Sequence, residues 1–441
     1  MYGQHWFLTH SVVSIATDLL VLWFVLSLLR QRRPAGNTIA WLLSVLLIPY
    51  LGIPLYLVIG GRKLAQRGKL PLVAQPECGV LGVPPTTLAS VEWLDDGVRA
   101  FDCFLSQIRG ARRSIRIVTF VVIDDETGRA LVQALLERAR EGLEVRLLID
   151  DLLRFHAPRK LLRELVRAGG RVERFMPLLH VPFRGHGNLR NHRKIAVFDG
   201  ERAIVGGMNF GREYMGPRPD PERWRDLSLL VSGAAVVELD RVFRADWQFA
   251  CAEQLAPAAR LAAGEIPVSV VPSGPDAASD PIYDADLTAI FRAERRIWIA
   301  TPYFVPDEAL VRALLIAVRR GVEVRVLTPA RSNHALSDFA AASCLRDLSA
   351  AGVVIQRFAK MLHAKTLLVD DTLSVVGSAN FDMRSLFLNY EIALFFSGKA
   401  EIERLALWFE AGFADSSIGP PQAGMLRSAL DDAARLVAPL L

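Results

Sequence analysis

Two stretches of equal length carry the same reactive side chains at the same spacing. They are "NHRKIAVFDGERAIVGGMN" at 191–209 and "LHAKTLLVDDTLSVVGSAN" at 362–380. The matched positions are His192, Lys194, Asp199, Gly206 and Asn209 in the first stretch and His363, Lys365, Asp370, Gly377 and Asn380 in the second. Average composition does not produce such agreement twice in one chain by chance. The repeat therefore predicts one site built from both copies.

Imidazole, ammonium and amide groups together suit the chemistry of a phosphodiester. Lys194 and Lys365, with the amides of Asn209 and Asn380, are predicted to hold the anionic phosphate oxygens and to stabilise charge in the transition state. One neutral imidazole would attack phosphorus and form a phosphohistidine, while the other, protonated, would donate to the departing alcohol and later activate the incoming one. This scheme requires no cofactor. Since no metal-ligand spacing accompanies the motifs, no metal is expected either.

Each histidine also needs a group that fixes its tautomer, preferably a carboxylate on the far ring nitrogen. Asp226 and Glu391 begin the runs "DLSLLVSG" and "EIALFFSG", which occupy matching places after the two motifs. We therefore predict that Asp226 and Glu391 orient the histidines. Asp199 and Asp370 belong to the catalytic motif, but each precedes a turn signal, so a structural role is expected for them.

The duplication extends beyond the motifs. The stretches 130–148 and 309–327 share twelve identical positions without a gap, and both lie where apolar strand-like runs alternate with amphipathic helical runs. This pattern predicts two α/β halves, 91–263 and 264–441, packed face to face about a pseudo-twofold axis.

Within each half, "HRKIAVFD" and "HAKTLLVD" are expected to be strands with His and Lys on one face. The glycines that end the returning strands are expected to let a backbone approach a ligand. Sixteen residues separate Phe175 from His192, whereas four separate Phe358 from His363, which predicts an insertion in the first half.

The N-terminal region differs in composition from both halves. Residues 11–29 and 39–60 carry one charge between them, Asp18, and each is long enough to cross a bilayer as a helix of about 20 residues. We predict a membrane anchor with two hydrophobic helices at 1–61, a helical hairpin, followed by a Pro- and Gly-rich linker at 62–90.

The course of the second apolar segment and the membrane side are both left open by the sequence. Pro49 and Pro54 flank Gly52, so the segment either spans the bilayer or bends and re-enters. Basic residues occur on both sides of it, so the positive-inside rule does not decide the orientation.

Composition restricts the partners. A net charge of +5 and a pI near 9.1 suit contact with anionic membrane lipid.

The cysteines form no CxxC pair, so neither a zinc knuckle nor a disulfide framework is indicated; they are Cys78, Cys103, Cys251 and Cys344. A nucleic-acid partner is not expected, because no extended basic and aromatic tract is evident. The oligomeric state is not indicated.

The pattern HxKxxxxDxxxxxxG[GS]xN resembles the phospholipase D superfamily over residues 91–441. The phrases "AWLLSVLLIPYLGIPLYLVIGG", "NHRKI", "WRDLSLLVSG" and "TPYFVPD" are similar to the bacterial cardiolipin synthases within it. This resemblance implies two phospholipase D-like α/β/α sandwich halves and transfer of a phosphatidyl group between two phosphatidylglycerol molecules, giving cardiolipin and glycerol. It also implies that His192 attacks and His363 donates the proton. A multi-pass protein of the bacterial inner membrane, with its catalytic halves on the cytoplasmic side, would follow.

Other functions remain open at this stage. The acceptor is phosphatidylethanolamine or another alcohol in one alternative, and water in a second, which would make the chain a membrane-bound phospholipase D. A nuclease and an inactive lipid-binding scaffold are further alternatives. All ten motif positions are present, which argues against the scaffold.

Overall fold

The computed structural model describes most of the chain from residue 85 onward and part of the N-terminal region. The described residues are 19, 21–26, 28–29, 35–48, 50–53, 56, 85–177, 189–277, 279–424, 427–428 and 430–431. The chain divides into two units, one of residues 1–64 with 179–188, the other of 65–178 with 189–441. Most of the predicted linker and of the predicted insertion lies outside the described residues.

In the described part of the first unit, large apolar side chains are found both buried and exposed. Helix α2 (Ala35–Leu47) belongs to a cluster in which Phe24 and Trp41 each meet the ring of Tyr56 edge-on, at 5.6 and 5.3 Å. None of its described residues is charged, and many of its leucines are exposed. Among the residues that the structure describes, no helix combines the length and apolar character needed to cross a membrane. The predicted segments 11–29 and 39–60 are only partly described.

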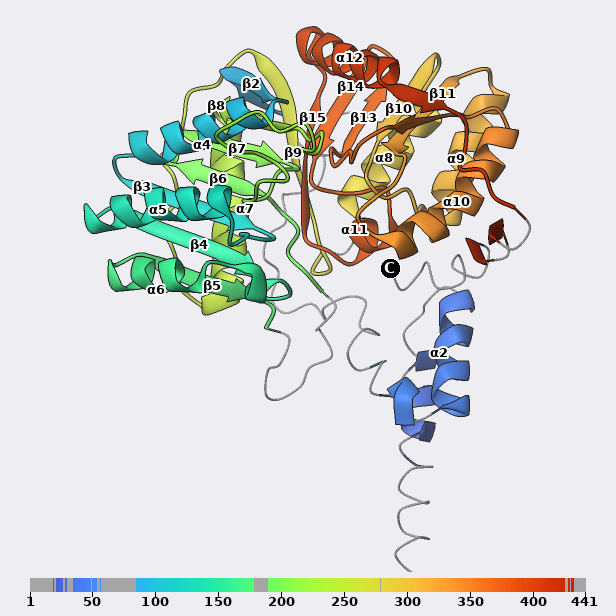
Figure 1. Ribbon diagram of the computed structural model, residues 1–441, viewed down its shortest axis with the longest axis horizontal. Coiled ribbons are helices and arrows are strands. Elements are labelled where there is room, and N and C mark those ends of the chain that lie inside the picture. Colours follow the sequence, from blue (N-terminus) through green and yellow to red (C-terminus); the bar gives the residue numbers. More distant parts are fainter. Residues whose placement is uncertain are drawn as a thin grey trace, which may run out of the picture. The chain divides into compact units, whose positions relative to one another are not determined.

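The second unit contains two mixed sheets (Figure 1). In order across the first sheet, the strands are β2 (Ser90–Leu94), β8 (Ser228–Ser232), β7 (Arg202–Gly206), β6 (Ile195–Phe198), β3 (Ser114–Thr119), β4 (Glu144–Asp150) and β5 (Arg171–Phe175). One face packs against α4 (Gly97–Gly110), α5 (Glu126–Arg140) and α6 (Arg159–Arg167), and α7 (Ala235–Cys251) packs against the other. A short 3-10 turn, Arg154–His156, precedes α6.

The second sheet repeats this order and adds a strand at each edge. Its strands are β1 (Thr86–Leu88), β9 (Ile266–Ser273), β15 (Glu391–Phe396), β14 (Leu373–Gly377), β13 (Thr366–Val369), β10 (Arg296–Ala300), β11 (Glu323–Pro329), β12 (Val354–Phe358) and β16 (Ser416–Ile418). The helices are α8 (Pro281–Arg292), α9 (Glu308–Arg319), α10 (Ala335–Ala350), the short α11 (Met383–Phe387) and α12 (Lys399–Ala414). Helices α8, α9 and α10 share one core with the sheet, and α12 contacts strands β12 to β14 and β16.

The equivalence of β2-β8-β7-β6-β3-β4-β5 and β9-β15-β14-β13-β10-β11-β12 confirms the prediction of a duplicated α/β fold. In both halves the last three strands of this order are parallel and the others pair antiparallel. The first strand of the second half, expected at the start of 264–441, is β9.

Two details differ from the sequence expectations. The linker expected at 62–90 ends in strand β1, which pairs antiparallel with β9 and so joins the sheet of the second half. The histidines and lysines of the motifs precede β6 and β13 and do not lie within them. The motif histidines and lysines therefore lie just before the first residues of two interior strands, where the backbone is free to bond to the other half.

The motif aspartates fix the turns at the far end of β6 and β13. Asp199 and Asp370 have φ values of 56° and 51°, the left-handed region that aspartate tolerates. Asp199 accepts the backbone N–H groups of residues 112 to 114 at 2.7 to 3.1 Å, and Asp370 accepts those of residues 294 to 296 at 2.8 to 2.9 Å. Burial raises the pKa of Asp199, but these donors outweigh it and hold the pKa below its usual value. Each carboxylate therefore ties its turn to the strand that follows α4 or α8.

This arrangement predicts that Asp370→Asn destabilises the protein. The variant loses the charge that strengthens three backbone hydrogen bonds, so the free energy of unfolding should fall by about 1–3 kcal/mol. Thermal unfolding of the full chain in detergent measures this. Asp371→Asn, which changes the exposed neighbour that pairs with surface arginines, is the control and should shift the midpoint little. Equal shifts for both variants would contradict the structural role.

Candidate active site

Two equivalent backbone contacts join the halves beside the histidines. The N–H of His192 donates to the carbonyl of Tyr390 at 2.9 Å, and the N–H of His363 donates to the carbonyl of Arg225 at 2.7 Å. Parallel bridges, Asn191 to Tyr390 and Arg225 to Leu362, lie at the same places. Each acceptor directly precedes the carboxylate that was expected to orient a histidine, so each motif is bonded to the other half at that point.

The carboxylate–histidine pairs are exchanged between the halves. Nδ1 of His192, in the first half, lies 2.9 Å from Oε1 of Glu391, in the second. Nδ1 of His363, in the second half, lies 2.7 Å from Oδ2 of Asp226, in the first. Both carboxylate side chains are completely buried. Because Nδ1 is engaged in each ring, Nε2 is the nitrogen that remains for chemistry.

Burial sets the protonation of the two rings. It lowers the pKa of His192 to about 4 and that of His363 to about 3, and the ammonium groups of Lys194 and Lys365 act in the same direction. At neutral pH both imidazoles are therefore neutral in the lipid-free site. Burial also opposes ionisation of Glu391, but the interaction with His192 outweighs it and the pKa of Glu391 lies below its usual value.

The two lysines lie among these groups. Burial holds the pKa of Lys194 well below its usual value and lowers that of Lys365 to about 8. Nζ of Lys365 lies 2.9 Å from Nδ1 of His363, and each lysine also donates to the carbonyl of its own motif histidine. The charge of each lysine influences the other half's histidine, which requires the four side chains to be close together. An anionic ligand between them would favour the charged lysines.

Aromatic rings cover both imidazoles. The ring of Phe120, which follows β3, meets His192 edge-on at 5.1 Å between centroids. His363 has two aromatic neighbours: Tyr214 meets it edge-on at 5.0 Å, and Trp224 lies tilted to it at 5.5 Å. These rings contribute to the burial that lowers the pKa values of the two imidazoles.

The two carboxylates are held differently. Gly207 follows β7, and a Cβ at this position would lie 2.1 Å from Oδ1 of Asp226, so the absence of a side chain gives the carboxylate its place. In the second half the same position is Ser378, whose hydroxyl donates to Glu391. The motif glycines, Gly206 and Gly377, are likewise close to the adjacent strand, at 2.5 Å in each case for an added Cβ. These glycines allow the adjacent strands to approach each other closely. The sequence had instead predicted that they would let the backbone approach a ligand.

The motif asparagines are buried and bond within their own halves. Thr119 donates to Oδ1 of Asn209 at 3.4 Å, and Asn209 also bonds to Tyr214. The amide of Asn380 donates to Asp382 at 2.9 Å, while its buried carbonyl oxygen has no partner among the described residues. The structure therefore brings together His192, Lys194, His363, Lys365, Asp226 and Glu391. Asn209 and Asn380 are hydrogen-bonded within their own halves, and Asp199 and Asp370 lie at the distant turns.

A further residue holds the two halves together at the site, although the sequence did not indicate it. Arg193, between His192 and Lys194, is buried and pairs with Asp246 of α7. It also donates to the backbone carbonyls of Glu391 and Ser273, both at 2.9 Å. It thus holds the carboxylate strand of the second half against the first. Comparison of the repeats does not reveal Arg193, because the second motif has Ala364 at this position. The only signal in the sequence is a charged residue between His192 and Lys194.

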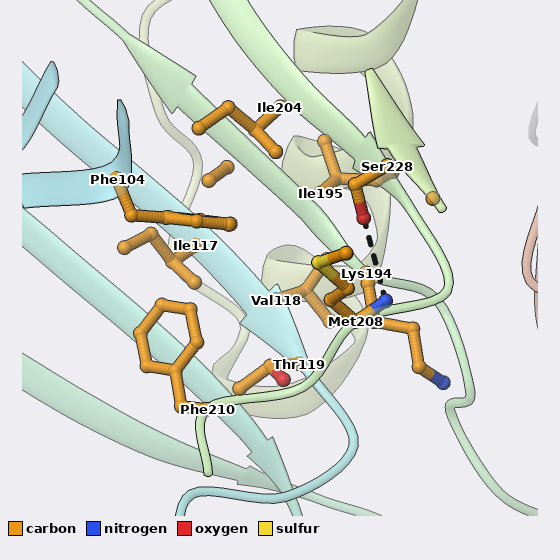
Figure 2. A pocket seen from close by; sticks show the side chains of 12 residues that line it. Phe104, Ile117, Val118, Thr119, Lys194, Ile195, Ile204, Met208, Phe210 and Ser228 are labelled. Atoms are coloured by element: carbon orange, nitrogen blue, oxygen red, sulfur yellow. Dashed lines mark hydrogen bonds between the residues drawn. The ribbon is translucent and has the colours of Figure 1, made fainter. Parts of the chain in front are cut away.

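A small cavity adjoins the first motif (Figure 2). Its volume is about 10 Å³, and it is lined by Phe104, Ile117, Val118, Thr119, Lys194, Ile195, Ala196, Ile204, Gly206, Met208, Phe210 and Ser228. The backbone N–H of Met208 donates to the hydroxyl of Ser228 at 3.4 Å across it. Such a volume holds about one water molecule, so this cavity does not receive a lipid headgroup. Within the described residues there is no group of His, Cys, Asp and Glu that could hold a metal ion.

Comparison with solved structures places this fold. The phosphatidylserine synthase of Haemophilus influenzae Rd KW20 superposes with a TM-score of 0.63 at 14% identity, over 81% of this chain and 97% of that one. A polyphosphate kinase of Porphyromonas gingivalis gives a TM-score of 0.52 at 14% identity, over 84% and 57%. At these identities the likeness concerns the fold alone.

Sequence comparison is more specific. Residues 104–247 and 287–412 match the family described as "Cardiolipin synthase, PLD-like domain", and residues 19–61 match "Phospholipase_D-nuclease N-terminal". A cardiolipin synthase of Geobacillus kaustophilus (strain HTA426) is 32% identical over 92% of this chain and 89% of its own. Cardiolipin synthase A of Pseudomonas fluorescens is 34% identical over 82% and 83%. The chain belongs to the cardiolipin synthase family of phospholipase D-like enzymes, which confirms the resemblance predicted from sequence.

The close packing at Gly207 generates a prediction. In Gly207→Ala the added methyl group would displace the carboxylate of Asp226 from His363, although Gly207 directly follows β7 and is not one of the five matched motif positions. Phosphatidyl-transfer turnover should fall roughly 10²–10⁴-fold, the usual contribution of a positioned acid–base group, while the thermal midpoint changes by a few degrees.

Ser378→Ala is the matched variant in the second half. It removes one hydrogen bond to Glu391 without a clash, so turnover should fall by about tenfold. If Gly207→Ala kept the turnover of the parent protein, Asp226 would not depend on the space beside Gly207.

Proposed function

We propose that this protein transfers a phosphatidyl group from one phosphatidylglycerol to a second, giving cardiolipin and glycerol. The observation that carries the proposal is the exchange of carboxylates, which fixes one imidazole of each half with Nδ1 occupied and Nε2 available. Family membership favours the same reaction. The proposal requires one phosphorus atom to lie between the two Nε2 atoms.

In the first step, Nε2 of His192 attacks phosphorus of the donor lipid. A bond forms between this nitrogen and phosphorus, and the bond to the glycerol headgroup oxygen breaks. His363 supplies the proton that the departing oxygen requires. In the lipid-free site His363 is neutral, so it must take up a proton when the lipid binds; the negative phosphate favours this by raising the pKa of His363.

In the second step, a headgroup hydroxyl of the acceptor phosphatidylglycerol attacks the phosphohistidine. Neutral His363 accepts the hydroxyl proton, a bond forms between the acceptor oxygen and phosphorus, and His192 is released. The carboxylate of Glu391 stabilises charge that develops on His192, and that of Asp226 does the same for His363. Both displacements use the same four groups, and no cofactor enters.

The remaining motif residues support the phosphate or the fold. Lys194 and Lys365 are assigned to the anionic oxygens of the phosphate, which would restore the charge that burial disfavours. Asn209 and Asn380 are assigned to the same oxygens through their amides, with the amide of Asn380 leaving Asp382 on binding. Asp199 and Asp370 act on the turns alone.

The protein is proposed to act at a membrane. The first unit exposes large apolar side chains, among them Trp23, Leu47 and Leu51, and its described residues carry no charge. Such a surface suits lipid better than water. We assign residues 1–61 to a multi-pass anchor in a bacterial inner membrane, with the catalytic halves on the cytoplasmic side. A bilayer location supplies both lipids and limits competing water.

The reaction is tested with the purified full chain and phosphatidylglycerol as the single lipid. We expect equal amounts of glycerol and a four-chain lipid by mass spectrometry, and His192→Ala should reduce both by at least about 10³-fold because the nucleophile is lost. Lys399→Ala, which changes an exposed lysine on α12, is the control and should retain turnover.

Two other outcomes would overturn the proposal. Phosphatidic acid as the sole product would make water the acceptor and the enzyme a phospholipase. A product that forms only after phosphatidylethanolamine or another alcohol is added would identify a different acceptor.

A further inference from the structure

A basic and apolar surface follows the C-terminal end of β4 in the first sheet. Leu152 and Phe155 are 39% and 63% exposed on the turn that precedes α6, and Val166 of α6 is 50% exposed. The guanidinium groups of Arg154 and Arg159 lie 4.6 and 4.9 Å from the ring centroid of Phe155. We call residues 152–167 the β4–α6 surface.

Helix α6 adds a row of unpaired cations. Its exposed basic residues are Arg159, Lys160, Arg163 and Arg167, and its one acidic residue is Glu164. Among the described residues, none of these four side chains forms an ion pair; Arg154 alone on this surface pairs with an acid, Asp151. The surface thus combines a large exposed ring with four basic side chains that form no ion pair within the described part of the chain, a composition suited to an anionic bilayer surface.

The duplication provides an internal comparison. The equivalent segment of the second half follows β11 and leads into α10, whose charged residues are Asp338, Arg346 and Asp347. Arg346 is paired with Asp431. The fold therefore does not require a basic helix at this position. At this position, only the helix of the first half carries an excess of positive charge.

A buried carboxylate connects this surface to the site. Asp150, the last residue of β4, accepts the backbone N–H of Leu152 at 2.9 Å. Its other oxygen accepts the backbone N–H of Asn191 at 2.8 Å, directly before His192. Arg190 also bonds to Asp150, at 3.3 Å. The side chain of Asp150 therefore links the exposed turn directly to the backbone beside His192, the proposed nucleophile.

We propose that the β4–α6 surface docks on an anionic phospholipid bilayer, with Phe155 and Leu152 in the interface and the cations of α6 on the lipid headgroups. This deepens the proposed function and rests on it, because it supplies the contact through which lipid reaches His192. The predicted anchor brings the protein to a membrane; the β4–α6 surface would orient the catalytic unit on it.

The test introduces a photoreactive benzoylphenylalanine at position 155 or, as a matched control, at position 407. Leu407 on α12 is similarly exposed, at 59%. Full-length protein is reconstituted in phosphatidylglycerol vesicles, irradiated and analysed for lipid adducts. We expect at least about ten times more adduct at position 155 than at 407, and a loss of that excess in phosphatidylcholine vesicles, which lack the negative surface potential.

Charge reversal on α6 provides a second arm. Arg159→Glu, Arg163→Glu and Arg167→Glu together should reduce the adduct at position 155 at least about tenfold, since each basic residue near the surface contributes roughly fivefold. The control reverses three exposed arginines on other helices, Arg109, Arg140 and Arg319, and should change the yield less than about twofold.

Equal lipid adducts at positions 155 and 407, or an adduct at 155 that is indifferent to headgroup charge and to the α6 reversal, would overturn the proposal. A protein adduct in place of lipid would also overturn it, by assigning the surface to a second copy. Cross-linking needs no turnover. Lipid adducts at 155 without cardiolipin synthesis would therefore refute the reaction and leave the docking surface, and the reverse result would refute the surface alone.

Discussion

The exchange of carboxylates between the halves is the interaction on which the site depends. A histidine buried among aromatic rings and lysines has no defined tautomer until one ring nitrogen is engaged. Glu391 engages His192 and Asp226 engages His363, each across the boundary between the halves. Neither half therefore contains a complete catalytic pair. Each half alone would hold a histidine without its carboxylate partner. Pairing each histidine with the carboxylate of the other half completes one site.

The same boundary explains several features that otherwise look unrelated. The motif histidines precede their strands, which frees their backbone N–H groups to bond to the opposite half. Gly207 leaves room for Asp226, and Arg193 ties the strand that carries Glu391 to α7 through Asp246. Charges buried in this way are costly unless paired. The pairing is distributed over both halves, so their association and the geometry of the site are coupled.

Much of this was predictable from the sequence. Fixed spacing in two copies indicated the reactive histidines and lysines, and matching positions of Asp226 and Glu391 marked them as partners for imidazole. Strand and helix periodicity gave the duplicated α/β fold. The sequence did not indicate which carboxylate meets which histidine, because a repeat is symmetrical and either pairing satisfies it. Arg193 was missed for the opposite reason, since it breaks the repeat, and strand β1 was missed because three residues show no periodicity.

The most direct test of the exchange uses a lipid phosphodiester with p-nitrophenol as its leaving group, which departs without a proton. Without the carboxylate of Asp226, the ring of His363 is no longer oriented for proton transfer. Formation of the phosphohistidine should continue, because this leaving group needs no proton, whereas breakdown of the phosphohistidine should slow, because the acceptor must still lose one. Asp226→Asn is therefore predicted to give a stoichiometric burst of nitrophenolate and to accumulate label on His192, as His363→Ala would. Glu391→Gln should give no burst, as His192→Ala would. The opposite pattern, with Asp226→Asn behaving like the loss of His192, would contradict the exchanged pairing.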